Sequence, residues 1–246
     1  MTAVEFDGDV ETMTTLVQRR IYGRRQSHRI RPARKRLLEE RLPELQIRVP
    51  EDGAHIQLGE VQSHARQRCW LEVGFGGGEH LAQQAAANPD VLLIGCEPYV
   101  NGVACLLSLI SDADNVRVVI DDARLLLKAL PAGSLERVFV LFPDPWPKAR
   151  HHKRRIVNPE TLADMARALK PGGELRLATD IMSYARPMLA ATLADGRFAW
   201  LAERPADWRE RPDDWPATRY EEKARKAGRR PVFLAFRRRE GDHASL

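Results

Sequence analysis

The sequence predicts an α/β protein whose sheet has seven mostly parallel strands and carries helices on both faces. Three observations support this fold class. From about residue 69, short apolar runs alternate with longer amphipathic stretches, as in a parallel sheet covered by helices. A glycine-rich turn follows the first apolar run, and acidic residues follow the second and third runs. Together these features predict a Rossmann-like arrangement with a ligand crevice at the carboxyl ends of the strands.

Strands are expected where the short apolar runs are bounded by turn residues. The last two runs predict an antiparallel pair at the edge of the sheet. In chain order, the seven expected strands are Cys69–Val73, Val91–Cys96, Val116–Ile120, Arg137–Phe142, Glu174–Ala178, Phe198–Ala202 and Val232–Phe236.

Helices are expected between these strands, and several end at prolines or small residues. Asn88 and Pro89 stop the first helix, Pro131 stops the third, and Pro171 with Gly172 closes the fourth. The five expected helices are Glu79–Ala87, Val100–Ile110, Ala123–Leu130, Pro159–Leu169 and Tyr184–Leu193. An irregular loop, long enough to be a functional segment, is expected before the last strand. It contains Trp208, Pro212, Trp215 and Pro216.

Length and composition predict one folded domain that follows a basic arm. The 246 residues are 43% hydrophobic, which is enough for a sizeable core. We expect the arm over residues 1–60 and the domain over residues 61–240. No apolar run approaches the ~18 residues of a membrane span, and the N-terminus lacks an apolar signal stretch, so we expect a cytoplasmic protein. The three cysteines lack CxxC spacing, which disfavours a disulfide framework and a metal site.

The positive charge is concentrated in three segments. The chain has 39 Lys and Arg against 34 Asp and Glu, a formal net charge of +5. Nine basic residues and no acid lie between Arg19 and Arg36, and subtracting this +9 from +5 leaves −4 for the remaining chain. A second cluster runs from Lys148 to Arg155, and a third from Arg219 to Arg239. Three basic segments suit a polyanion, because each neutralised phosphate releases counterions. Ordinary solvated surface charge is the alternative.

The segment Leu71–Gly78 predicts a strand that runs into a glycine-rich turn and opens a helix. After Gly74 and Gly76, the third glycine of a dinucleotide fingerprint would fall at Glu79, so NAD and FAD are disfavoured. Without a ligand, the same residues would form only a tight turn between strand and helix.

Acids follow the next two strands. Glu97 lies 19 residues after Gly78, where an acid can accept both ribose hydroxyls of an adenosine. Asp121 and Asp122 could meet an adenine amino group, although a single acid at such a place is more often a helix N-cap. A loop without pyrophosphate geometry, together with an acid for a ribose, fits S-adenosylmethionine. Glu72 could bias the site toward this cationic ligand.

The fourth strand leads into Pro143, Asp144, Pro145 and Trp146. Prolines on both sides of the acid fix the backbone, and the Trp146 ring offers a flat face for stacking a base. A plain surface turn is the alternative, as is a Trp146 that only packs the motif against the sheet.

At these residues the chain resembles the bacterial tRNA (guanine-N(7)-)-methyltransferase family, which has the class I methyltransferase fold. The Pro-Asp-Pro-Trp segment with its basic tail is far more specific than the glycine loop, and the resemblance spans most of residues 70–237. The matching stretches are LEVGFGGGEHL at Leu71–Leu81, FPDPWPKARHHKRRIV at Phe142–Val157, LATD at Leu177–Asp180 and TRYEEKARKAG at Thr218–Gly228. The arm matches only through Tyr22–Arg25, and we expect it to be partly disordered without RNA.

The resemblance implies transfer of a methyl group from S-adenosylmethionine to N-7 of the variable-loop guanine of tRNA, at tRNA position 46. The residues implied to bind the cofactor are Glu72, Gly74, Gly76, Glu97, Asp122 and Asp144. Those implied to hold the guanosine are Lys148, Asp180, Thr218, Arg219, Tyr220 and Glu221. Those implied to lie along the RNA are Arg150, His151, His152, Lys153, Arg154 and Arg155. No metal and no obligate protein partner are expected, and the protein is expected to be a monomer or a homodimer.

Methylation at N-7 needs no general base, since this atom has a lone pair and no proton to lose. A carboxylate close to the purine would stabilise the charge that develops, and Asp144 is the first choice, with Asp180 the second. An enzyme that methylates an exocyclic base nitrogen or a protein amide is one alternative. A catalytically idle RNA-binding protein on the same scaffold is the other.

Overall fold

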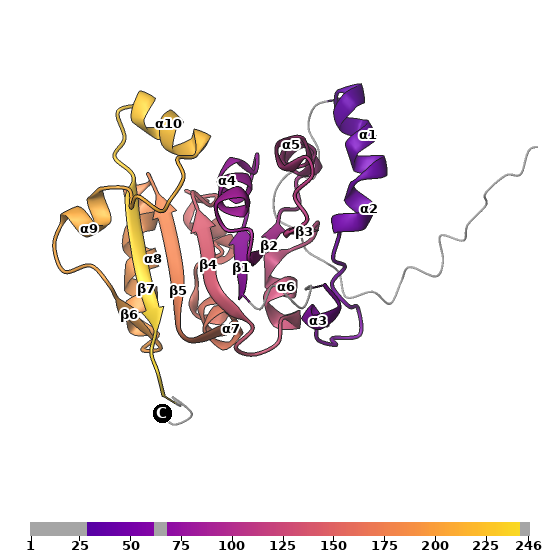
Figure 1. The fold of residues 1–246 in the computed structure, drawn as a ribbon. Helices are drawn as coiled ribbons and strands as arrows, with labels where there is room; N and C mark the ends of the chain where they lie inside the picture. The colour runs from indigo at the N-terminus through magenta and orange to yellow at the C-terminus, as the bar shows by residue number, and fades with distance from the viewer. Residues whose placement is uncertain (1–28, 62–67, 242–246) are drawn as a thin grey trace, which may run out of the picture.

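Seven strands form one sheet in the computed structural model of the chain, which describes residues 29–61 and 68–241 (Figure 1). The spatial order is β3-β2-β1-β4-β5-β7-β6, and all pairs are parallel except those that β7 forms with β5 and β6. The bounds are β1 Arg68–Val73, β2 Val91–Cys96, β3 Val116–Val119, β4 Leu135–Leu141, β5 Leu169–Thr179, β6 Phe198–Trp200 and β7 Val232–Arg238. This confirms the predicted fold class, including the antiparallel pair at the edge.

Helices cover both faces of the sheet and divide the core into two parts. One core contains side chains of α4 and α5, and the other contains side chains of α6, α7 and α8. The α-helices are α1 Pro32–Glu40, α2 Leu42–Leu45, α3 Leu58–Val61, α4 Glu79–Ala87, α5 Val100–Ile110, α6 Ala123–Ala129, α7 Pro159–Ala168, α8 Met182–Ala194, α9 Ala206–Arg209 and α10 Arg219–Lys226. A 3₁₀ helix, η2, spans Ala149–Arg154.

Most element bounds agree with the prediction to within two residues, and the main differences have physical causes. The fourth strand ends at Leu141 because Phe142 has a left-handed φ of 51°. The fourth predicted helix ends before Leu169, which pairs with Leu135 and begins β5 well before the predicted Glu174. Helix α10 lies in a region without a predicted helix, and Figure 1 shows it above the upper edge of the sheet.

Part of the predicted arm packs against the sheet. Leu45, Ile47 and Val49 are buried, and the Ile47 N–H donates to the Val118 carbonyl at 2.9 Å. Figure 1 shows α1 beside α5, and α2 contacts β3. The predicted division of the chain at residue 60 stays a prediction. The basic residues between Arg19 and Arg25, with the matching Tyr22–Arg25, lie outside the described residues.

Candidate active site

The turn after β1 has a backbone that requires glycine. Gly74, Gly76 and Gly78 have φ angles of 72°, 57° and 82°, in the region that side chains disfavour. Gly78 is the N-cap of α4, so the turn leads directly into a helix N-terminus. A further glycine supports the turn from α5: a Cβ on Gly102 would lie 2.1 Å from the Gly76 carbonyl oxygen. The loop therefore lies directly on the α5 backbone.

A cavity of about 420 Å³ lies at the carboxyl edge of the sheet beside this loop. Of the six residues predicted to bind the cofactor, all but Glu72 line it. Its wall also contains four aromatic residues and two arginines. These residues are Tyr99, Phe142, Trp146, Tyr220, Arg124 and Arg154. The structure thus brings the glycine loop, the ends of β2 to β4 and one residue of α10 around a single space.

Glu97 is the buried acid of the cavity, and backbone donors hold its carboxylate. It accepts hydrogen bonds from the N–H of Gly76 at 2.8 Å and from the N–H of Tyr99 at 3.0 Å. Burial raises the pKa of Glu97, the two backbone bonds act in the opposite direction, and the charges of Asp144 and Glu72 raise it further. The cavity therefore holds several carboxylates close together and favours a cationic ligand.

Asp122 and Glu72 each have partners in the protein. The Asp122 carboxylate caps α6 by accepting from the Arg124 N–H at 2.9 Å, and it also pairs with the Arg124 side chain. Glu72 is buried behind the loop, where its carboxylate lies 2.8 Å from Nδ1 of His80. Glu72 therefore acts on the cavity through its charge, as its effect on Glu97 indicates.

The segment after β4 is bent at both ends by residues with left-handed backbone. Phe142 has φ 51° and Trp146 has φ 42°. Arg155 stabilises the bend from inside, because its Nε donates to the Pro145 carbonyl at 2.9 Å and its guanidinium lies 4.6 Å from the Tyr184 ring centre. Arg155 is only 6% exposed, which argues against the RNA contact predicted for it.

The rest of the basic cluster faces outward on η2. Lys148, Arg150, His152 and Lys153 are exposed, whereas His151 is half-buried with its ring 5.9 Å from the Trp146 ring. The Arg154 guanidinium lies over the Trp146 ring at 4.9 Å. Desolvation and the positive charges of Arg154 and Arg150 lower the pKa of His151. This end of the cavity is therefore a positive surface, as a nucleic-acid phosphate requires.

Helix α10 presents the last group of predicted residues. Its N-cap is Thr218, whose hydroxyl accepts from the Glu221 N–H at 3.1 Å. Tyr220 lines the cavity, and Arg219 lies 3.6 Å from Glu79. Glu221 is buried and forms ion pairs with Arg211 and Arg225, so its carboxylate stabilises α10 in its position. Thr218, Arg219 and Glu221 are thus near the cavity without lining it.

Lys148 and Asp180 also lie outside the cavity wall, and Asp180 pairs with Arg229. Sequence reasoning overlooked Gly102, Arg124 and Arg229. Of these three, only Gly102 could have been singled out from the sequence, because an isolated glycine within an apolar helix pattern often has a packing role.

Residues 29–61 and 68–241 contain no group of three or more His, Cys, Asp or Glu side chains that could hold a metal ion. In the same ranges, no helix has the length and apolar character needed to cross a membrane.

Comparison with known proteins gives the family. A sequence family described as "Putative methyltransferase" matches residues 66–234. The tRNA (guanine-N(7)-)-methyltransferase of Rhodospirillum rubrum is 50% identical over 224 residues, covering 89% of this chain and 88% of that protein. The protein of the same name from Ruegeria sp. (strain TM1040) is 52% identical over 228 residues, covering 90% and 89%.

Solved structures agree on the fold. The aminoglycoside resistance methyltransferase NpmB1 has a TM-score of 0.51 at 19% identity, covering 74% of this chain and 92% of that chain. A 16S rRNA (adenine(1408)-N(1))-methyltransferase from Catenulisporales acidiphilia has a TM-score of 0.51 at 16% identity, covering 76% and 91%. These likenesses bear on the fold alone. The curated relatives carry the assignment, and the chain belongs to the tRNA (guanine-N(7)-)-methyltransferase family.

Proposed function

We propose that this chain transfers a methyl group from S-adenosylmethionine to N-7 of the variable-loop guanine of tRNA. The observation that carries the proposal is the juxtaposition of an acid-rich cavity beside a glycine loop with the basic surface of η2. Membership in the family supports the donor, the tRNA and the atom methylated. A tRNA substrate favours the cytoplasm as the place of action, with the protein working as a monomer or a homodimer.

The residues of the cavity fit S-adenosylmethionine. The Glu97 carboxylate is fixed by two backbone N–H groups and keeps lone pairs for ribose hydroxyls. Glu97, Asp122 and Asp144 all line the space, a donor set suited to a cation and poorly suited to a pyrophosphate. When bound, this cofactor supplies a methyl group on a positively charged sulfur.

Asp144 is the residue we assign to the guanine. It lies in the cavity wall, is exposed to solvent, and is held between two prolines in a segment that Arg155 supports. Its carboxylate can accept from the N-1 and N-2 donors of guanine and can stabilise the positive charge that forms on the purine. Adenine lacks these donors and would leave the acid unpaired, so the same contact selects the base.

The rest of the wall positions the purine. The Trp146 ring, with the Arg154 guanidinium over it, offers a flat surface for stacking. No proton has to leave N-7, so the contribution of the protein is to place this atom in line with the methyl group. Placement of this kind can supply about 7 to 11 kcal/mol of a barrier.

The experiment incubates the purified protein with labelled S-adenosylmethionine and an unmodified tRNA transcript, followed by cleavage selective for N-7-methylated guanine. Cleavage at the variable loop is the expected result. Cleavage elsewhere in the tRNA would contradict the variable-loop target, and label without cleavage would contradict N-7.

The Asp144→Asn variant tests the residue assignment. It should retain the melting temperature of the wild type and lose about 10²- to 10³-fold in kcat, as when one preorganised charge-stabilising group is removed. Asp112→Asn, which alters an exposed acid outside the cavity wall, is the matched control and should retain full activity. Near-normal turnover by Asp144→Asn would refute the assignment.

A further inference from the structure

Two shielded arginines lie on the same face of the sheet, away from the cavity. Arg137 of β4 pairs in register with Glu174 of β5, and Phe139 pairs with Arg176. The side chain of Arg137 is 18% exposed and that of Arg176 is 8% exposed. Burial and the nearby Arg176 cation lower the pKa of Arg137. Two neighbouring cations of low exposure need carboxylates for compensation.

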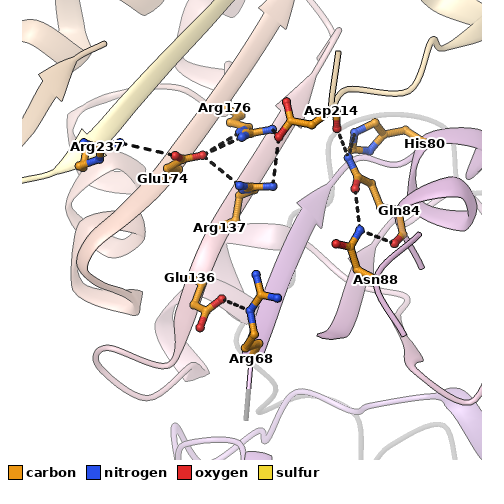
Figure 2. A network of polar contacts seen from close by, with 10 residues as sticks. All are labelled: Arg68, His80, Gln84, Asn88, Glu136, Arg137, Glu174, Arg176, Asp214 and Arg237. Carbon is orange, nitrogen blue, oxygen red and sulfur yellow. Dashed lines mark hydrogen bonds and ion pairs between the residues drawn. The ribbon is translucent and has the colours of Figure 1, made fainter. Parts of the chain in front are cut away.

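Two carboxylates provide this compensation. Glu174 lies on the sheet, 2.8 Å from Arg176 and 3.3 Å from Arg137. Asp214 comes from the connection between β6 and β7 and lies 2.7 Å from Arg176 and 3.6 Å from Arg137. Figure 2 shows the Asp214 carboxylate facing both arginines. If Asp214 were absent, the two shielded guanidinium groups would share Glu174.

The backbone of Asp214 and the side chain of Trp215 also hold this segment against the rest of the protein. The Gln84 side-chain amide of α4 donates to the Asp214 carbonyl at 2.8 Å, a contact drawn in Figure 2. Trp215 is buried, with its ring edge-on to Phe139 and Phe233. The Asp214–Trp215 segment is thus attached to α4 and to the sheet at once.

This segment is connected to α10 through Arg211. One guanidinium nitrogen of Arg211 donates to the Trp215 carbonyl, and its Nε lies 3.3 Å from the buried Glu221 carboxylate of α10. Only Pro216 and Ala217 separate Trp215 from the N-cap Thr218. The position of α10 therefore depends on where the Asp214–Trp215 segment is held.

The N-terminal turn of α10 reaches the cofactor cavity. Tyr220 lines the cavity and lies so close to the glycine loop that a Cβ on Gly76 would be 2.9 Å from its ring. A shift of α10 would open the cavity at this side.

We propose that Asp214 is a positioning residue for methyl transfer, which with Arg137 and Arg176 holds α10 and its Tyr220 over the cofactor cavity. The proposal rests on the proposed function, because the cavity is taken as the site of S-adenosylmethionine. Asp214 touches neither the cavity nor the glycine loop, and it acts through the segment that it anchors.

The test compares Asp214→Asn, Asp214→Glu and the control Asp213→Asn, which removes a neighbouring exposed acid. We call the position of α10 in this structure, with Tyr220 in the cavity wall, the closed position. If only about a tenth of the molecules hold α10 in this closed position, the Kd for S-adenosylmethionine rises about tenfold. Saturating cofactor selects the closed position, so the KM for S-adenosylmethionine rises while kcat stays within about twofold. A purely structural loss would instead reduce the active fraction, and so kcat, at an unchanged KM.

Titration calorimetry with S-adenosylmethionine alone, steady-state methylation of a tRNA transcript and limited trypsin digestion provide the readouts. Asp214→Asn should also be cut faster within residues 219–230, and Asp214→Glu should recover the wild-type Kd in large part. If Asp214→Asn does not fold, Arg211→Met interrupts the same connection outside the arginine pair and should give the same rise in KM. Unchanged Kd and KM in a folded Asp214→Asn variant overturn the proposal, whatever the trypsin result.

The wild type separates this proposal from the proposed function. A wild-type chain that methylates tRNA while Asp214→Asn behaves like Asp213→Asn refutes the role of Asp214 alone. A wild-type chain that binds no S-adenosylmethionine refutes both.

Discussion

Replacing Gly102 by Ala tests whether the glycine loop depends on direct contact with α5. Gly102 lies within the helix Val100–Ile110, where alanine would ordinarily stabilise the protein by about 1 kcal/mol. The structure predicts the opposite sign, because the added Cβ would lie 2.1 Å from the Gly76 carbonyl oxygen.

The size of the effect follows from two contacts. To bring the Cβ to oxygen distance from 2.1 Å to 3.0 Å, the Gly76 backbone must move by about 0.9 Å. A movement of that size threatens the 2.8 Å bond from the Gly76 N–H to Glu97, and a bond to a charged group contributes about 1.5 to 3 kcal/mol. Overpacking adds about 1 to 3 kcal/mol. After the gain in helix propensity, a net loss of about 1.5 to 5 kcal/mol remains.

For a chain of this size, such a loss lowers the melting temperature by on the order of 3 to 20 °C. The affinity for S-adenosylmethionine should fall by at least about tenfold, since 1.4 kcal/mol of lost interaction is enough for that factor. Differential scanning calorimetry and titration calorimetry measure the two quantities. Gly59→Ala is the matched control, because it adds a Cβ with nothing within 4 Å in helix α3. A Gly102→Ala protein as stable as the wild type, with unchanged affinity, would refute the reasoning.

Two further predictions concern charge. Because burial and neighbouring acids raise the pKa of Glu97, and its ionised form suits a cationic ligand, affinity for S-adenosylmethionine should be full above this pKa and fall as the pH drops through it. Titration calorimetry from pH 8 to 5 should show this fall in the wild type and a flatter profile in Glu97→Gln, and equal profiles would contradict it. Arg155→Met should lower the melting temperature and leave the salt dependence of tRNA binding unchanged, since the buried Arg155 supports the Pro145 carbonyl. The exposed Lys153→Met should do the reverse, reducing the slope of log K against log salt by about 0.7 to 0.9, and the opposite pattern would refute both placements.

The sequence by itself determined the fold class and the edge of the sheet where the cavity lies. Buried parallel strands are continuous apolar runs, so β1 and β2 could be located from composition alone. The carboxyl ends of neighbouring parallel strands meet at one edge of a sheet. The sequence alone therefore predicted that Glu97 and Asp122 lie beside the glycine loop, and both line the cavity with Gly74 and Gly76. The Pro-Asp-Pro-Trp segment was also visible, because proline and aromatic residues act locally.

Only the tertiary structure decided which way individual side chains point. Arg154 and Arg155 are adjacent in a basic run, yet one lies over Trp146 in the cavity wall and the other is buried against Tyr184. Helix α10 has few apolar residues, so its periodicity was weak, and its place is set by contacts with Arg211, Glu79 and the glycine loop. Charge and polarity along the chain are local properties, whereas burial and ion pairing depend on segments that are distant in sequence. For this reason the role of Asp214, whose arginine partners lie 38 and 77 residues away, could be inferred only from the folded chain.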